Sequence, residues 1–172
     1  MSLELKNPHS VLAAAKPRPL FGILDGMQDP HNFGAVIRSA HVLGVDALFV
    51  PSRGQVEVTA QVARSSAGAV NYLRIAQADD LLSLASQLRS RAIRLIGASQ
   101  NAARPIFACD LTTPTAIVIG NEGSGIRPEL LEACDELVII PQFGALESLN
   151  AAVSAGILFY EAQRQRQLRT GS

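Results

Sequence analysis

Residues 115–150 read TAIVIGNEGSGIRPELLEACDELVIIPQFGALESLN, and this stretch decides the fold. Its first apolar run, residues 116–119, is rich in β-branched side chains and predicts a buried strand. A second apolar run, residues 137–140, ends at Pro141 and predicts another strand. Between the two, Arg127-Pro128-Glu129 favours the start of a helix, because proline fits a first helical turn and an acid there suits the helix dipole. A strand, a helix and a strand in this order are typical of a parallel α/β sheet.

The loop that follows the first of these strands is rich in glycine, with Gly120, Gly123 and Gly125 close together. Such a backbone can come near a ligand, and in open α/β sheets ligands bind beside loops at the carboxyl ends of strands. We therefore expect Glu122, Ser148 and Asn150 to converge on one pocket. The spacing is neither GxGxxG nor that of a P-loop, so a phosphate site is weakly supported. Taken alone, this loop would more often be a plain turn.

Outside this stretch, strand and helix patterns alternate. Strands are predicted at residues 20–24, 45–50, 71–75 and 93–97, and helices at 58–67, 78–91 and 148–166. The helix at 78–91 is expected to turn Leu81, Leu84, Ala85 and Leu88 inward. Asn32 is a candidate N-cap for a further helix, which carries Arg38 and ends at Gly44. The fold class is therefore α/β, with a mostly parallel sheet and helices on both faces. Residues 1–19 contain three prolines and predict an irregular arm or linker remnant, and residues 20–169 predict a single domain.

The composition agrees with one well-buried domain, since 48% of the 172 residues are hydrophobic and 17% are charged. The formal net charge is zero, so any affinity for nucleic acid must come from a local patch. Cys109 and Cys134 lack metal-ligand spacing, which indicates reduced thiols, a cytoplasmic setting and no metal site. No apolar run reaches the roughly 18 residues of a membrane span, so no membrane is expected.

Three blocks of the sequence resemble the SpoU/TrmH branch of the SPOUT superfamily, which contains RNA ribose 2′-O-methyltransferases. The first block, residues 29–40, reads DPHNFGAVIRSA and is similar to the family's N-x-G-x-x-x-R motif. The second, residues 117–126, reads IVIGNEGSGI and is followed by Ile139-Ile140-Pro141. The third, residues 147–158, reads ESLNAAVSAGIL. Their order and separation make the resemblance specific over roughly residues 20–166.

The resemblance implies a deep trefoil knot in the C-terminal part of the sheet, S-adenosylmethionine as methyl donor, and a homodimer with sites at its interface. An unknotted doubly wound sheet would be expected from the pattern alone, because threaded chains are rare. By the same resemblance the donor would be held by Gly120, Asn121, Ile140, Gln142, Ser148 and Leu149. Small residues in the last helix, Ala152, Ala155 and Gly156, also permit close packing of another helix.

The implied reaction is 2′-O-methylation of rRNA or tRNA, in which a neutral hydroxyl must lose its proton while its oxygen is held in line. Arg38 matches the family's catalytic arginine. Because an arginine side chain stays protonated under physiological conditions, we favour a role in stabilising the alkoxide or orienting a phosphate. Asn32 would position Arg38 or the ribose, and Glu122 would anchor its loop or the partner's Arg38. Ser148 and Asn150 would line the methyl pocket.

Structural explanations compete with these roles. Arg38 could be a solvated residue on a helix face, and Asn32 and Ser148 could be helix caps. The basic end of the last helix, residues 164–169, predicts a solvated helix end first and a phosphate contact second. Two other functions stay open. One is a non-catalytic RNA-binding or assembly protein that keeps the fold. The other is a Rossmann-type nucleotide enzyme, which lacks its early glycine fingerprint here.

Many members carry an additional N-terminal RNA-binding domain. We therefore expect this chain to be either the catalytic part of such a protein or a smaller enzyme that recruits structured RNA through its dimer surface.

Overall fold

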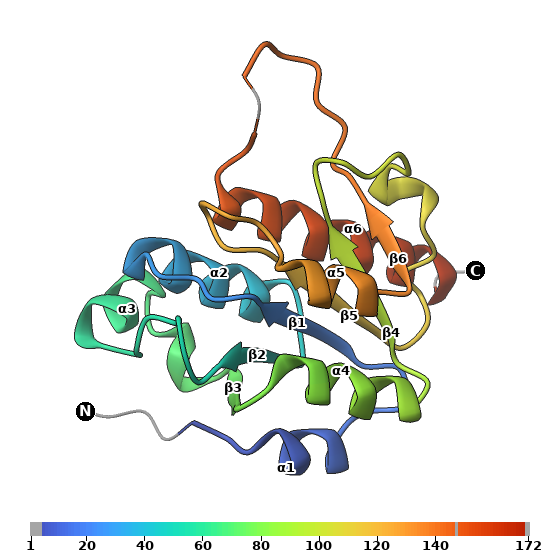
Figure 1. Ribbon diagram of the computed structural model, residues 1–172. Helices are drawn as coiled ribbons and strands as arrows, with labels where there is room; N and C mark the ends of the chain where they lie inside the picture. The colour runs from blue at the N-terminus through green and yellow to red at the C-terminus, as the bar shows by residue number, and fades with distance from the viewer. Residues whose placement is uncertain (1–4, 147, 171–172) are drawn as a thin grey trace.

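A computed structural model describes residues 5–146 and 148–170 and shows one parallel sheet packed between two layers of helices (Figure 1). Within the described part of the chain the sheet has six strands, in the order β3-β2-β1-β5-β4-β6. All the strand pairs are parallel. The strands are β1 Leu20–Leu24, β2 Ala47–Pro51, β3 Arg74–Ala78, β4 Arg94–Ala98, β5 Thr115–Ile119 and β6 Glu136–Val138.

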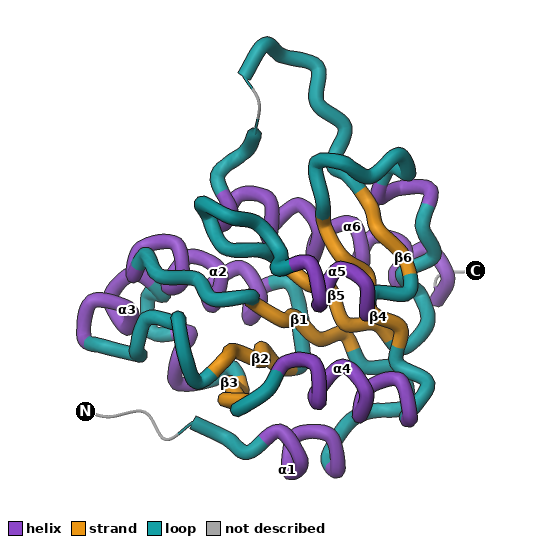
Figure 2. The backbone as a smooth tube through the Cα atoms, in the orientation of Figure 1, coloured by secondary structure: helices purple, strands orange, loops and turns teal. Residues whose placement is uncertain are grey.

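The helices cover both faces of this sheet, as Figure 2 shows. One face carries α1 Pro8–Ala13, α4 Leu81–Ser90 and α5 Pro128–Ala133, and the other carries α2 Pro30–Val42, α3 Ala60–Ser65 and α6 Ala151–Thr170. Short 3-10 helices are η1 Ala69–Asn71 and η2 Ile106–Ala108. Each face has its own cluster of buried apolar side chains. The expected α/β architecture is therefore confirmed.

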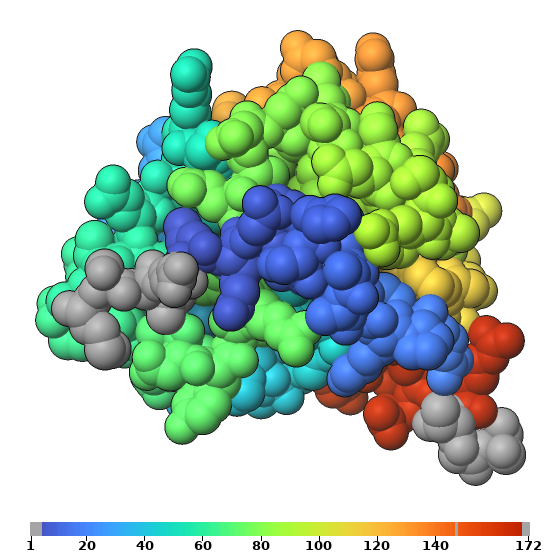
Figure 3. All heavy atoms as spheres, turned by 90° about the horizontal axis from the view of Figure 1, so that it is seen from below, coloured from blue at the N-terminus to red at the C-terminus, as the bar shows by residue number. Residues whose placement is uncertain are grey.

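Helix α1 lies within the first 19 residues, where the sequence predicted an irregular arm. That prediction is wrong for residues 8–13. Asn7 accepts a hydrogen bond from the His9 amide, and Val11 and Leu12 are buried. Arg91 beyond α4 donates to the Leu12 carbonyl oxygen, and Figure 3 shows the α1 segment lying against the α4 segment. Three prolines obscured this element, although Pro8 sits at the first helical turn, where proline is tolerated.

Helix α2 begins two residues earlier than Asn32, so Asn32 is not its N-cap. The Asp29 side chain accepts hydrogen bonds from the amides of His31 and Asn32, and Pro30 occupies the first turn. Both Asp and Asn are good caps, and the preference of proline for that first turn selects Asp29. The side chain of Asn32 is thereby released for other contacts.

Other element boundaries also move. The strand predicted at residues 71–75 is Arg74–Ala78, because residues 69–71 form η1 after the left-handed turn at Ala67 and Gly68. The predicted inward face of α4 is confirmed, with its four members buried: Leu81, Leu84, Ala85 and Leu88. Pairing with β2 fixes where β3 starts, and a single sequence does not reveal that register.

The connection between β4 and β5 wraps around strand β6. On one side β6 pairs with β4, and on its other side Pro105 forms a parallel bridge with Ile139. The amide of Ile106 donates to the Ile139 carbonyl oxygen, and the amide of Ile139 donates to that of Arg104. The last strand is thus flanked on both sides by an earlier segment of the chain. This arrangement is what a knot would require, and the deep trefoil knot itself stays a prediction.

Candidate functional site

A pocket of about 490 Å³ opens at the carboxyl ends of β4, β5 and β6. Its lining includes all six residues predicted to hold a cofactor, namely Gly120, Asn121, Ile140, Gln142, Ser148 and Leu149. Glu122, predicted as catalytic, is also in the lining. Residues far apart in the sequence therefore meet at the edge of the sheet where ligands of open α/β folds bind. Whether they hold a cofactor stays a prediction.

The glycine-rich loop after β5 is a tight turn built on close backbone contact. The backbone amides of Asn121 and Gly125 each donate to the other's carbonyl oxygen, and Gly125 has a φ of 71°. A Cβ on Gly120 would lie 2.3 Å from the carbonyl carbon of Gly125, so only glycine fits there. The Asn121 amide group donates to the Gly26 carbonyl oxygen at 2.6 Å. The loop thereby presents its backbone to the pocket in a fixed shape.

Glu122 links this loop to the beginning of α2. Its carboxylate oxygen Oε1 accepts hydrogen bonds from the backbone amides of Gln28 at 3.0 Å and Asp29 at 2.7 Å. These two hydrogen bonds hold the two loops together, although Gln28 and Asp29 lie 94 and 93 residues before Glu122 in the sequence. As a hydrogen-bond acceptor in these contacts, Glu122 acts as a brace between two segments of the site.

An ion pair between the buried Asp25 and the half-exposed Arg127 makes a second link between the same two loops. The Asp25 carboxylate, whose side chain is 3% exposed, accepts from the backbone amide of Arg127 at 2.7 Å and from its Nε at 2.8 Å. Hydrogen bonding to Asp25 raises the pKa of the Arg127 guanidinium. Neither residue was predicted to belong to the site, because nothing local relates an aspartate after β1 to an arginine before α5.

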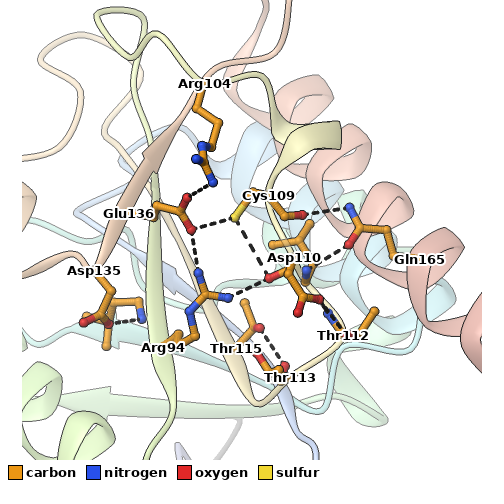
Figure 4. Close-up of polar contacts among 12 residues, drawn as sticks. Arg94, Arg104, Cys109, Asp110, Thr112, Thr113, Thr115, Asp135, Glu136 and Gln165 are labelled. Carbon is orange, nitrogen blue, oxygen red and sulfur yellow. Dashed lines mark hydrogen bonds and ion pairs between the residues drawn. The ribbon is translucent and has the colours of Figure 1, made fainter.

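Residues 138–140 line the pocket, and Glu136, two residues earlier on β6, is the centre of the polar cluster in Figure 4. Arg94 on β4 and Arg104 in the β4–β5 connection both donate to its carboxylate. The Cys109 thiol, 3.2 Å away, also donates to it. Burial, reinforced by Glu136, raises the pKa of Cys109 to about 11. The cluster is a structural support that fastens the β4–β5 connection to β6. Neither Cys109 nor Cys134, elsewhere in the chain, forms a disulfide.

The C-terminal end of α6 is hydrogen-bonded to the β4–β5 connection. Gln165 donates to the Cys109 carbonyl oxygen and accepts from the Leu111 amide (Figure 4). Arg166 donates to carbonyl oxygens of four residues: Arg18, Pro19, Leu111 and Thr113. The prediction of a solvated basic helix end is therefore wrong for Arg166, which packs against the loop and is only partly exposed.

Three residues predicted as catalytic, Arg38, Asn32 and Asn150, lie outside the pocket lining. Asn150 caps α6, since its Oδ1 accepts from the amides of Ala152 and Val153, so the proposed cap at Ser148 is wrong. Its Nδ2 donates to Oδ1 of Asn32 at 3.1 Å, which joins the first and third sequence blocks. Arg38 is exposed, and it forms no hydrogen bond or ion pair with any of the described residues.

An apolar groove runs along the outer side of α2 and α6. Ala35 and Ser39 line it from α2, and α6 contributes five residues: Ala152, Val153, Gly156, Ile157 and Tyr160. Val153, Ile157 and Tyr160 are 51%, 37% and 58% exposed. The side of α6 that faces the core consists instead of Ala155, Leu158, Phe159 and Ala162. The small residues predicted for close packing thus divide between core and surface.

Sequence reasoning missed part of the pocket, namely Ser99, Gln100 and Asn101. These polar residues follow the strand predicted at 93–97, and the same rule about carboxyl ends would have identified them. Among residues 5–146 and 148–170, no three or more His, Cys, Asp or Glu side chains gather where they could hold a metal ion. No helix in those ranges is both long and apolar enough to cross a membrane.

Comparison with known proteins adds to this geometry. The model of the SpoU rRNA Methylase family matches residues 19–160. The 23S rRNA (guanosine-2'-O-)-methyltransferase RlmB of Photobacterium profundum is 37% identical over 87% of this chain and 61% of its own length. RlmB of Vibrio vulnificus is 39% identical over 90% of this chain and 63% of its own length. The chain thus spans less than two thirds of the length of either relative.

Solved structures show the same fold. A crystal structure of an RNA 2'-O ribose methyltransferase superposes with a TM-score of 0.81 at 36% identity, covering 88% of this chain and 58% of that one. The SpoU methyltransferase AviRb from Streptomyces viridochromogenes, in complex with AdoMet, gives a TM-score of 0.83 at 32% identity. That match covers 89% of this chain and 60% of AviRb.

Proposed function

Because the chain belongs to the SpoU rRNA Methylase family, we propose that it transfers a methyl group from S-adenosylmethionine to a ribose 2′-hydroxyl of rRNA or tRNA. The observation that carries this proposal is the convergence of Gly120, Ile140 and Leu149 on one pocket at the carboxyl edge of the sheet. The names of the relatives, which are RNA 2'-O-methyltransferases, support the reaction class.

The residues of the pocket fit the proposed donor. A volume of about 490 Å³ lies in the range of small-molecule sites, which combine apolar walls with a few directed polar groups. Val138, Ile140 and Leu149 supply apolar wall, and the turn at Gly120 brings backbone groups to the same space. Polar side chains at Asn101 and Ser124 complete it. S-adenosylmethionine bound here would supply an electrophilic methyl group for the ribose oxygen; its sulfur would keep the bonding electron pair, and the hydroxyl proton would leave to solvent.

Arg38 acts in this proposal as a fixed cation. A guanidinium stays protonated and stabilises a developing alkoxide or holds the neighbouring phosphate without giving up a proton. Arg38 has the freedom this requires, since it is exposed and bonded to none of the described residues. On a helix of 100° per residue, Arg38 points about 120° away from Asn32, so it faces outward from its own protomer's site.

We place Arg38 at the site of a second copy of the chain. The apolar groove on α2 and α6 supports a homodimer, because it exposes Val153, Ile157 and Tyr160 beside small residues that allow helices to approach. A partner docked on this groove would lie next to Arg38 of the first copy. Structured RNA is the proposed substrate partner, and a cytoplasmic location stays a prediction.

Two measurements test the proposal. Calorimetric titration with S-adenosylmethionine should show binding that Gly120→Val abolishes, because a side chain at this position collides with Gly125. Tritiated methyl transfer to total RNA should then show 2′-O-methyl nucleotides after digestion. Donor binding with no transfer to any RNA would instead favour a non-catalytic RNA-binding protein, and NAD binding tighter than donor binding would favour a nucleotide enzyme of another class.

A further inference from the structure

The side chain of Asn150 at the start of α6 has only one possible orientation. Its Oδ1 position lies 2.8 Å from the amide nitrogen of Ala152 and 3.2 Å from that of Val153. Backbone N–H groups can only donate, so the atom that faces them must be the oxygen of the Asn150 amide. Its NH₂ group is consequently turned away from the helix.

This fixed NH₂ group determines the orientation of Asn32 as well. Nδ2 of Asn150 lies 3.1 Å from Oδ1 of Asn32, 118 residues earlier in the chain. An NH₂ group cannot accept, so Asn32 must present its oxygen to Asn150 and turn its own NH₂ group elsewhere. None of the residues in 5–146 and 148–170 accepts a hydrogen bond from that NH₂ group. Asn32 therefore offers a free donor, while its oxygen already accepts from Asn150.

The location of this free donor relates it to the pocket. Asn150 directly follows Ser148 and Leu149, and Ala151 and Ser154 on the first turn of α6 also line the pocket. Asn32 is hydrogen-bonded to Asn150, whose two chain neighbours, Leu149 and Ala151, both line the pocket, so the side chain of Asn32 lies close to the pocket lining.

We propose that Asn150 is a positioning residue that holds Asn32 with its N–H groups toward the ribose, so that Asn32 donates a hydrogen bond to the 2′-oxygen as negative charge develops there. This inference rests on the proposed function. The opposite orientation of Asn32 would turn a carbonyl oxygen toward the developing charge and repel it. A donor aimed at developing charge accounts for roughly 10²- to 10³-fold in kcat in enzymes where it has been removed.

The variant Asn150→Asp separates the helix cap from the orientation of Asn32. An aspartate still accepts from the amides of Ala152 and Val153 and caps a helix as well as asparagine, but it cannot donate to Asn32. Asn32 then turns its NH₂ group to the new carboxylate and its oxygen to the ribose. The expected result is a kcat lower by roughly 10²-fold, with donor affinity within about twofold of wild type and an unchanged or higher urea midpoint.

Two further variants control this measurement. Asn71→Asp places the same charge change on an exposed asparagine at the end of η1, which is not part of the pocket lining, and should leave kcat unchanged. Asn32→Asp keeps an acceptor for Nδ2 of Asn150 but has no N–H group. It should fold normally, bind the donor, and lose at least as much kcat as Asn150→Asp.

The amide orientation is also visible without any reaction. In ¹H–¹⁵N spectra of the ligand-free protein, the side-chain NH₂ protons of Asn32 should move downfield in Asn150→Asp, because they now donate to a carboxylate. Wild-type methylation by Asn150→Asp, or an unmoved Asn32 signal, overturns the inference and leaves the proposed function intact. A wild-type chain that binds no donor and methylates no RNA overturns the proposed function and this inference with it.

Discussion

The backbone nitrogen of Asp29 lies 2.7 Å from the carboxylate oxygen Oε1 of Glu122, which comes from the second sequence block. Asp29 in turn caps α2, the helix that carries Asn32 and Arg38. One carboxylate therefore couples the loop that lines the pocket to the helix that carries the proposed catalytic cation. The site is a set of braced loops, and several of its polar residues hold backbone in place.

Replacing Glu122 should loosen this brace. Glu122→Ala leaves the amides of Gln28 and Asp29 without their acceptor, and we expect the free energy of unfolding to fall by about 1–2 kcal/mol. Glu122→Gln keeps one acceptor oxygen and should lose less. Urea unfolding measures both. Equal losses for the two variants would mean that the negative charge, rather than the hydrogen bond, matters.

Replacing Arg38 should remove activity without affecting the fold. Because Arg38 is exposed and bonded to no described residue, Arg38→Ala should keep the wild-type urea midpoint and donor affinity. If the guanidinium stabilises the alkoxide, kcat for RNA methylation should fall by roughly 10²- to 10³-fold. Arg64→Ala, on the exposed side of α3, is the matched control. A normal rate for Arg38→Ala would remove it from the mechanism.

The pair between Asp25 and Arg127 should be the costliest ion pair to break. Asp25→Asn removes the charge that the half-exposed guanidinium of Arg127 pairs with and replaces one acceptor oxygen by an NH₂ group, and we expect the free energy of unfolding to fall by about 1.5–3 kcal/mol. The exposed Lys16, which pairs with Asp46, provides the comparison. Lys16→Ala should lower the free energy of unfolding by less than about 1 kcal/mol. Thermal or urea unfolding compares them, and similar costs would contradict the importance of burial.

Alkaline pH should destabilise the protein through its thiols. Burial raises the pKa values of Cys109 and Cys134 from the ordinary 9.0 to about 11. Between these values the unfolded chain releases protons that the folded chain keeps, so stability is full below pH 9 and falls as pH rises toward 11. The double variant Cys109→Ala/Cys134→Ala should show a shallower fall in urea midpoint over that range. An identical slope would show that other groups cause it.

The groove on α2 and α6 should be the interface of the proposed dimer. Ile157→Asp places a charge in its centre, and we expect a monomer by light scattering together with loss of methylation, since Arg38 no longer reaches a second site. Phe107→Asp, an equally drastic change at an exposed aromatic on η2, should leave the oligomeric state unchanged. A wild-type chain that is monomeric would contradict the dimer.

Most elements of the fold were predictable, because apolar runs and helical periodicity are local properties of the sequence. Strand β1 was predicted residue for residue, and the buried face of α4 was correct. The order of strands in the sheet, the start of β3 and the helix α1 were not, since pairing register and packing involve residues far apart.

For the candidate site, the sequence by itself determined which residue types were available: a glycine-rich loop, an arginine on a predicted helix, and amides able to cap or to donate. Only the tertiary structure decided among their uses. Asp29 rather than Asn32 caps α2, and Asn150 rather than Ser148 caps α6. An amide has few hydrogen-bonding positions, so its free group is set by the partners already bound, and for Asn32 that partner, Asn150, lies 118 residues away.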